Sequence, residues 1–249
     1  MRDLAKYEKD YAGQPYERFQ VKFRKRKIQE TLARHAHQSI LEVGCGLVPL
    51  FREFGDFERL TILEPAELFF RHAQEEIATS PVRDRVEILR ATLEEGSTLL
   101  TGKKFNLIIL SSLLHEVGDP EGFLRRIWAL AGAETVIHVN VPNALSFHRL
   151  LAFESGLITS PHQLSPSNVQ FQQSTVFDLP ALCALAGRCG FTMLESGTYA
   201  IKPFTHQQME DILQTGILSE KVIDSLYAME KYAPGCGSEI FVNLRKSSA

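Results

Sequence analysis

Short apolar runs alternate with longer amphipathic stretches along the first half of the chain. Five runs are rich in Ile, Leu or Val and are too short to form full helices, which predicts strands. They are SILEV (39–43), RLTIL (59–63), RVEIL (85–89), FNLIIL (105–110) and TVIHV (135–139). The stretches between them carry apolar residues at helical spacing, and in one of them Asp119 and Pro120 suit the start of a helix. This alternation indicates a parallel sheet covered by helices on both faces.

The second half of the chain is less regular. Residues 177–190 predict a helix that ends at Gly190, followed by a sixth strand around 191–201 and a seventh at 238–246. Two insertions interrupt this pattern: residues 143–175, and about 35 residues before the seventh strand that contain two helical patterns. We expect these insertions to determine substrate specificity and oligomer contacts.

Composition narrows the class of protein. The 249 residues are 44% hydrophobic and 23% charged, which is typical of a single large domain spanning residues 1–249. A net charge of -3 gives no overall attraction to a polyanion, which argues against nucleic acid as a partner. The N-terminal segment lacks the apolar core of a signal peptide, and no apolar stretch approaches the roughly 20 residues that span a bilayer. The four cysteines lack metal-ligand spacing. We therefore expect a soluble, cytoplasmic protein without membrane contact and without a metal site.

The segment SILEVGCG (39–46) places an acid and two glycines where the first predicted strand ends. Ligands of open α/β sheets bind beyond the carboxyl ends of the strands, and Gly44 and Gly46 would let backbone amides approach a ligand closely. A tight strand-to-helix turn without a ligand is the alternative. Pro49 replaces the third small residue of a dinucleotide fingerprint, which disfavours a pyrophosphate. Glu64, at the end of the second strand, can accept both hydroxyls of a ribose, so these features indicate an adenosine ligand without phosphates.

Four segments resemble the motifs of the S-adenosylmethionine-dependent methyltransferases with a Rossmann-like fold. They are ILEVGCG, LTILEP, RVEILRATLEE and FNLIILSSLLHEVGDP, and the resemblance covers about residues 39–140. It implies an α/β fold, a Rossmann-like three-layer sandwich whose seven-stranded, mostly parallel sheet has an antiparallel last strand, here with helical insertions in the second half. The domain would comprise an N-terminal helical lid (1–38), a cofactor-binding core (39–140) and an acceptor-side half (141–249).

The resemblance also implies a binding site for S-adenosylmethionine. The methionine part of this cofactor would be surrounded by Glu42, Gly44, Cys45 and Gly46. Glu64 would bind the ribose, and Pro65 would lie near the adenine. Thr92 and Leu93 align with the segment that contacts the adenine edge, where many family members carry an aspartate that this chain lacks.

Residues that follow the fourth and fifth strands are candidates for the reacting side. By the same resemblance, Ser111 and Ser112 would face the sulfonium and its methyl group. A hydroxyl acceptor must lose its proton, and histidine suits a base at neutral pH. We favour His148, after the fifth strand, slightly over His115, after the fourth. The alternatives are that His115 hydrogen-bonds the turn before Asp119 and that His148 lies on a solvated helix face.

Other polar residues are candidates for contacting the substrate. They are Tyr11, Tyr16, Asn143 and Arg149, of which the two tyrosines would belong to the lid. His138, inside the fifth predicted strand, is interpreted as a buried core residue. The basic run at residues 22–27 is interpreted as solvated surface, with contact to a phosphorylated acceptor as the alternative.

Segments at 140–151, 201–209 and 235–243 resemble a subset of bacterial methyltransferases associated with small molecules, often sugars or secondary metabolites. We therefore expect methyl transfer from S-adenosylmethionine to a hydroxyl of a small-molecule acceptor. One alternative is a methyltransferase of RNA or protein. Another is a cofactor-binding regulator without transfer activity. A homodimer is compatible with the sequence.

Overall fold

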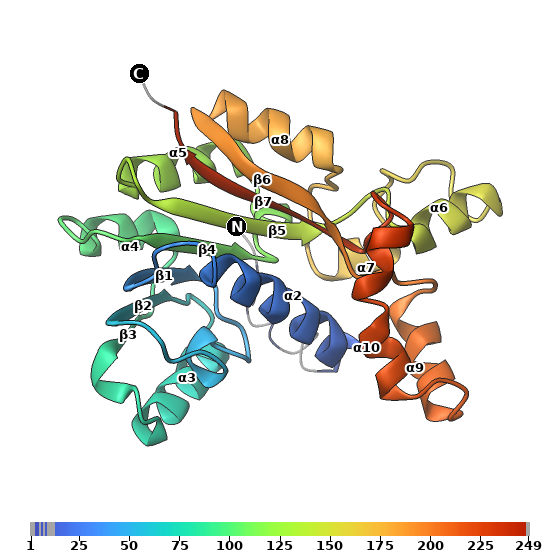
Figure 1. The fold of residues 1–249 in the computed structure, drawn as a ribbon, viewed down its shortest axis with the longest axis horizontal. Coiled ribbons are helices and arrows are strands. Elements are labelled where there is room, and N and C mark those ends of the chain that lie inside the picture. The colour runs from blue at the N-terminus through green and yellow to red at the C-terminus, as the bar shows by residue number, and fades with distance from the viewer. Residues whose placement is uncertain (1–2, 5, 7, 9–12, 248–249) are drawn as a thin grey trace.

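A seven-stranded sheet forms the centre of the computed structural model, which describes residues 3–4, 6, 8 and 13–247 (Figure 1). The strands are β1 (Ser39–Val43), β2 (Arg59–Leu63), β3 (Val86–Leu89), β4 (Leu107–Ser111), β5 (Val136–Pro142), β6 (Phe191–Tyr199) and β7 (Glu239–Lys246). Their order in the sheet is β3-β2-β1-β4-β5-β7-β6. All pairs among β1 to β5 are parallel, whereas β7 runs antiparallel to both β5 and β6. The prediction of a mostly parallel sheet with an antiparallel last strand is thereby confirmed.

The ends of β5 and β6 differ from the sequence prediction by three and two residues, and each difference has a local cause. β5 continues to Pro142 because its last residues pair with the start of β7, where Pro142 lies opposite Glu239. β6 ends at Tyr199 because Ala200 adopts a left-handed backbone conformation with a φ of 59°. Both differences lie at the carboxyl edge of the parallel strands, where ligands of such sheets bind.

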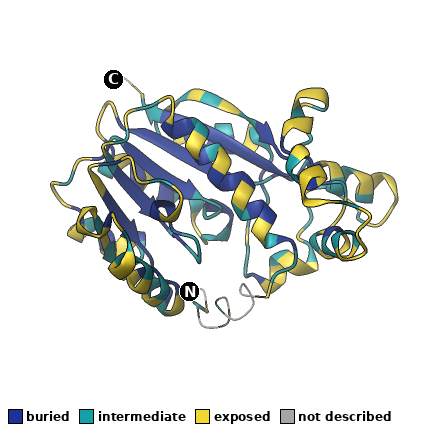
Figure 2. Cartoon of the chain, turned by 60° about the horizontal axis from the view of Figure 1, so that its bottom comes forward, coloured by how far each residue is buried: buried dark blue, intermediate teal, exposed yellow. Residues whose placement is uncertain are grey.

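Helices cover both faces of the sheet and complete the three predicted layers. One face carries α2 (Glu17–Leu32) and α3 (Glu67–Thr79), and the other carries α4 (Leu93–Leu99), α5 (Pro120–Leu130) and α8 (Leu179–Arg188). Ile28 and Leu32 of α2 share a core cluster with Ile40 of β1, for example. Figure 2 shows the strands buried between helices whose outer sides are exposed. α5 begins as predicted, since the Asp119 carboxylate accepts a hydrogen bond from the Gly122 amide at 2.9 Å.

The insertions of the second half form helices at one end of the sheet (Figure 1). They are α6 (Phe147–Glu154) and α7 (Pro166–Gln170) after β5, and α9 (His206–Gln214) and α10 (Glu220–Ser225) between β6 and β7. Short 3-10 helices occupy Leu50–Arg52, Arg83–Arg85, Leu114–Glu116 and Ala228–Tyr232. An aromatic cluster that includes Tyr16, Phe23, Tyr199 and Tyr227 joins the insertion around α9 and α10 to α2 and the sheet. None of the described helices is both long enough and apolar enough to cross a membrane.

Candidate functional site

The turn after β1 is shaped by glycine backbone conformations and by one buried carboxylate. Gly44 and Gly46 have positive φ values of 75° and 56°, which other residues rarely adopt. A Cβ on Gly46 would meet no atom within 4 Å, so this residue faces open space rather than packed core. The Glu64 carboxylate accepts hydrogen bonds from the amides of Cys45 at 3.0 Å and Gly46 at 3.2 Å. The turn therefore holds a fixed shape beside an open space, as a ligand-binding turn requires.

Glu64 links the ends of β1 and β2 through both of its carboxylate oxygens. Oε2 accepts hydrogen bonds from the two amides of the turn, and Oε1 accepts one from the Ala66 amide at 2.9 Å. Burial raises the pKa of the Glu64 carboxyl, while the three amide hydrogen bonds oppose this shift. A carboxylate can accept about four hydrogen bonds. Glu64 can therefore still accept a hydrogen bond from a hydroxyl in the cavity that it lines.

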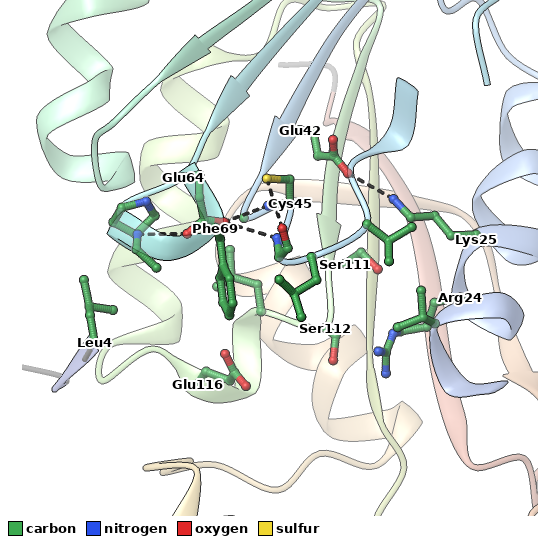
Figure 3. A pocket seen from close by; sticks show the side chains of 18 residues that line it. Leu4, Arg24, Lys25, Glu42, Cys45, Glu64, Phe69, Ser111, Ser112 and Glu116 are labelled. Carbon is green, nitrogen blue, oxygen red and sulfur yellow. Dashed lines mark hydrogen bonds and ion pairs between the residues drawn. The ribbon is translucent and has the colours of Figure 1, made fainter. Parts of the chain in front are cut away.

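A cavity opens beside this turn, at the carboxyl edge of β1, β2 and β4 (Figure 3). Its empty space, including the part open to solvent, is about 840 Å³. Its walls come from the N-terminal segment, α2, the turn, the residues after β2 and the segment after β4. The lining residues are Leu4, Val21, Arg24, Lys25, Glu42, Gly44, Cys45, Gly46, Leu47, Val48, Glu64, Pro65, Ala66, Phe69, Ser111, Ser112, Leu113 and Glu116. All the predicted cofactor-binding residues are among them except Thr92 and Leu93.

Thr92 and Leu93 have structural partners at the start of α4. The Thr92 hydroxyl accepts a hydrogen bond from the Glu95 amide at 3.3 Å, and the Glu95 carboxylate accepts one from the Thr92 amide at 2.9 Å. Leu93 is buried in the core beneath α4. Their contact with an adenine edge stays a prediction. The cavity is also lined by Phe69 of α3, an aromatic side chain that was not among the residues predicted from the sequence.

Lys25 of α2 forms a buried ion pair in the wall of the cavity. Its ammonium lies 3.3 Å from Glu42 Oε1, and Glu42 Oε2 accepts a hydrogen bond from the Leu50 amide at 3.0 Å. Both charged side chains are buried and line the cavity, as Figure 3 shows. The cavity therefore presents one cation and one anion side by side between α2 and the glycine turn.

Arg24 is the second cation that α2 contributes to the cavity. Its guanidinium contacts the Glu17 carboxylate and lies 3.5 Å from Glu239 Oε1. Because Arg24 and Lys25 are buried, the interpretation of residues 22–27 as solvated surface is wrong for these two side chains, whereas Lys22 and Arg26 are exposed. The sequence carried a signal for this, since Gln20, Arg24 and Ile28 repeat every four residues on the helix face that the structure buries.

β4 ends in two serines that line the cavity opposite α2 (Figure 3). Asn140 of the neighbouring β5 orients both, because its Oδ1 accepts the Ser112 amide at 3.0 Å and its Nδ2 donates to Ser111 Oγ at 3.1 Å. Ser112 has a φ of 54°, and its bond to Asn140 holds this left-handed conformation. His138 lies two residues before Asn140 on β5, and its Nδ1 is 2.8 Å from Asn243 Oδ1. Burial lowers the pKa of His138 to about 4. The interpretation of His138 as a core residue is confirmed.

Three of the four predicted substrate residues belong to the described part of the chain, and none of these three lines the cavity. Tyr11 lies outside the described residues. Tyr16 is buried in the aromatic cluster, and burial raises the pKa of its hydroxyl. Asn143 donates to two carbonyl oxygens of the loop before β7, at 3.1 and 2.8 Å. Arg149 donates to a carbonyl oxygen of the loop after α6 at 2.7 Å. The last two side chains therefore stabilise loops, and any contact with a substrate stays a prediction.

The two candidate bases lie on different elements at the sheet edge. His115 is buried in the 3-10 helix after β4, and its Nε2 lies 3.8 Å from the carboxylate of Glu116, which lines the cavity. His148 belongs to α6, and its Nδ1 is buried, so the alternative of a solvated helix face is wrong. Burial and the nearby Lys202 and His206 lower the pKa of His148 well below its ordinary value. His148 is therefore a neutral imidazole at pH 7.

The described residues contain no group of three or more His, Cys, Asp or Glu side chains that could hold a metal ion. The functional groups of the site are thus carboxylates, buried cations, serine hydroxyls, imidazoles and the amides of a glycine turn. This set can bind an uncharged ribose and a zwitterionic group, and it can accept a proton.

Comparisons with known proteins agree with this geometry. A family model described as a methyltransferase domain matches residues 16–196. No curated protein matches the sequence. Among solved structures, an S-adenosylmethionine-dependent methyltransferase from Thermotoga maritima is similar with a TM-score of 0.60 and 15% identity, covering 93% of this chain and 91% of that one. The cyclopropane synthase MmaA2 from Mycobacterium tuberculosis is similar with a TM-score of 0.57 and 15% identity, and the match covers 88% of this chain and 83% of that one. An O-methyltransferase from neocarzinostatin biosynthesis is similar with a TM-score of 0.51 and 13% identity, and the match covers 84% of this chain and 49% of that one. Its structure is a complex with S-adenosylmethionine and 2-hydroxy-5-methyl naphthoic acid.

Proposed function

Because the chain belongs to the S-adenosylmethionine-dependent methyltransferases, we propose that it methylates a hydroxyl group of a small molecule, such as a sugar or a secondary metabolite. The observation that carries the proposal is the cavity, where a glycine turn and the buried Glu64 meet buried, carboxylate-paired cations of α2. Because these cations are buried and paired with carboxylates, they offer no exposed basic surface to an RNA, which favours a small acceptor. The O-methyltransferase from neocarzinostatin biosynthesis and its naphthoic acid ligand support this choice.

The residues that line the cavity fit the proposed cofactor in charge and in shape. Glu64 has remaining capacity to accept a hydrogen bond from one ribose hydroxyl, and the glycine turn gives backbone amides close access to a ligand. Lys25 and Glu42 offer one cation and one anion, which complement the carboxylate and the ammonium of a methionine group. When bound, S-adenosylmethionine supplies an electrophilic methyl group on its sulfonium.

The residues of this chain then have two tasks, alignment and proton removal. Ser111 and Ser112, which Asn140 holds in place, border the side of the cavity that faces the acceptor half. A positioned base contributes about 10² to 10⁴-fold to such a transfer. His148 is our first candidate for that base because its imidazole is neutral at pH 7, and His115 is the second. An acceptor that is already nucleophilic would need only the alignment.

Calorimetric titration of the purified protein tests the cofactor, and a transfer assay tests the acceptor. S-adenosylhomocysteine should bind, and a hundredfold excess over its Kd should stabilise the fold by about 2.7 kcal/mol. NAD should not bind. Radiolabelled S-adenosylmethionine should then label hydroxylated small molecules and leave total RNA and denatured cell protein unlabelled. Binding of NAD without S-adenosylhomocysteine would contradict the cofactor, and label in RNA or protein would contradict the small-molecule acceptor.

A further inference from the structure

A second group of buried and half-buried polar side chains adjoins the cavity at Arg24. Arg24 lines the cavity, and its guanidinium also reaches Glu239, the first residue of β7. Glu239 interacts electrostatically with Lys202, which in turn lies near His148 and His206. We call His148, Lys202, His206 and Glu239 the edge cluster. Its members come from α6, the segment after β6, the start of α9 and β7, so the cluster exists only in the folded chain.

The strand register places the edge cluster beside the reacting side of the cavity. Ser111 lies opposite Asn140 across β4 and β5, and Pro142, two residues further along β5, lies opposite Glu239 of β7. Neighbouring strands are about 4.8 Å apart and residues rise about 3.3 Å along a strand, so the backbones of Ser111 and Glu239 lie roughly 12 Å apart. A molecule slightly larger than a monosaccharide spans this distance. One end of such a molecule can meet the cavity while its other end meets the edge cluster.

Two charged groups of the edge cluster are buried with unused hydrogen-bonding capacity. Lys202 is 6% exposed, and none of the described residues gives its ammonium a hydrogen bond or an ion pair within 4 Å. Glu239 is 2% exposed, and its Oε2 has no partner, whereas Oε1 faces Arg24. Burying a charge without a partner destabilises a fold. Such groups are therefore expected where a ligand completes the set of partners.

The charges around the imidazoles are positive. Lys202 and Arg149 act on His148, and Lys202 and Arg24 act on His206, so the positive charges come from the lysine and the two arginines. Burial and these cations lower the pKa of both imidazoles, and no carboxylate acts on either ring among the described residues. The two carboxylates that act on Lys202, those of Glu17 and Glu239, both contact Arg24. The end of the cluster formed by Lys202 and the two imidazoles therefore attracts a negative charge.

We propose that the edge cluster binds an anionic group of the acceptor, a carboxylate or a phosphate, at Lys202 and His148. A hydroxyl of the same molecule donates to Glu239 Oε2. This inference rests on the proposed function and narrows it, because the acceptor becomes an acidic, hydroxyl-bearing small molecule. A neutral sugar would leave the Lys202 ammonium without a counter-charge.

The test uses the full chain saturated with S-adenosylhomocysteine, with inorganic phosphate and acetate as probes. Sodium chloride at matched ionic strength controls for screening. Lys202→Met removes the ammonium and keeps the apolar stem, and Lys221→Met, on the exposed face of α10, is the matched control. Binding is followed by the melting temperature and by the imidazole signals of His148 and His206 in long-range ¹H–¹⁵N spectra. The two probes distinguish a phosphate acceptor from a carboxylate acceptor.

At least one anion should raise the melting temperature of the unmodified chain and of Lys221→Met, and should shift both imidazole signals. Lys202→Met should lower the affinity for that anion by at least about tenfold, while its affinity for S-adenosylhomocysteine stays unchanged. Without anion, Lys202→Met should melt no lower than the unmodified chain, because the buried ammonium that it removes has no hydrogen bond and no ion pair within 4 Å among the described residues.

Three results would each overturn this proposal. They are the absence of binding of both anions at tens of millimolar, equal anion binding by Lys202→Met, and a lowered melting temperature of Lys202→Met without anion. Failure of the proposed function has different signatures: S-adenosylhomocysteine would not bind even to the unmodified chain, or RNA or protein would be labelled in the transfer assay.

Discussion

Glu64→Ala is the most informative single substitution, because Glu64 serves the glycine turn and the proposed ribose site at once. The change removes the carboxylate that accepts from the amides of Cys45, Gly46 and Ala66. It also removes the only carboxylate at the end of β2 that lines the cavity, among the residues described. We expect two separable effects, a weaker affinity for S-adenosylhomocysteine and a lower stability of the free protein.

The size of the affinity effect follows from the hydrogen bonds lost. A hydrogen bond to a charged group contributes about 1.5–3 kcal/mol, so losing one ribose contact weakens binding roughly 10- to 150-fold. The stability effect comes from amides left without an acceptor, at about 1–3 kcal/mol each. Cavity water can reach part of the turn, so we expect the loss to stay near the lower limit. For a chain of this length, each kcal/mol lowers the melting temperature by about 2–4 °C.

Isothermal titration with S-adenosylhomocysteine measures the first effect, and thermal unfolding measures the second. Glu75→Ala, which removes an exposed carboxylate of α3, is the matched control and should change neither. Glu64→Gln should give an intermediate result, because one amide oxygen cannot accept from the turn and from Ala66 together. If Glu64→Ala stays folded and binds with unchanged affinity, the assignment of this carboxylate to the ribose is wrong.

Three further substitutions test other parts of the site and the core. Lys25→Met leaves Glu42 as a buried charge without its cation, so urea unfolding should show a loss of about 3 kcal/mol, and calorimetry should show weaker S-adenosylhomocysteine binding. His138 has a pKa of about 4 in the fold and an ordinary value of 6.5, so this side chain should contribute a loss of about 3 kcal/mol of stability as pH falls from 6.5 to 4. His138→Gln should lack this loss in urea unfolding at the two pH values. Once an acceptor is known, His148→Ala should lower turnover at least about a hundredfold with S-adenosylhomocysteine affinity unchanged, and the same pattern in His115→Ala alone would reverse the assignment of the base.

The parts of the fold that were predicted correctly depend on local pattern. β1 and β2 begin and end where the apolar runs do, because each run is bounded by residues that leave the sheet. Asp119 caps α5 as expected, since a helix cap involves only the next three residues. The end of β5 was not predicted because it depends on the pairing of Pro142 with Glu239, which is distant in the sequence. The end of β6 was not predicted because the apolar pattern does not indicate the left-handed conformation of Ala200.

The same distinction explains why the cofactor side was predictable and the acceptor side was not. The glycine turn and Glu64 lie close together in the sequence, and their motif order carries the information. The contact between Arg24 and Glu239 joins residues 215 positions apart. It depends on β7 running antiparallel between β5 and β6, because only this direction brings the first residue of β7 to the carboxyl edge of the parallel strands. A parallel β7 would carry Glu239 to the opposite edge, far from Arg24 and Lys202. The resemblance to the family implied this direction, but the contact between Arg24 and Glu239 also depends on the register of β7 against β5, and no short segment of the sequence records that register.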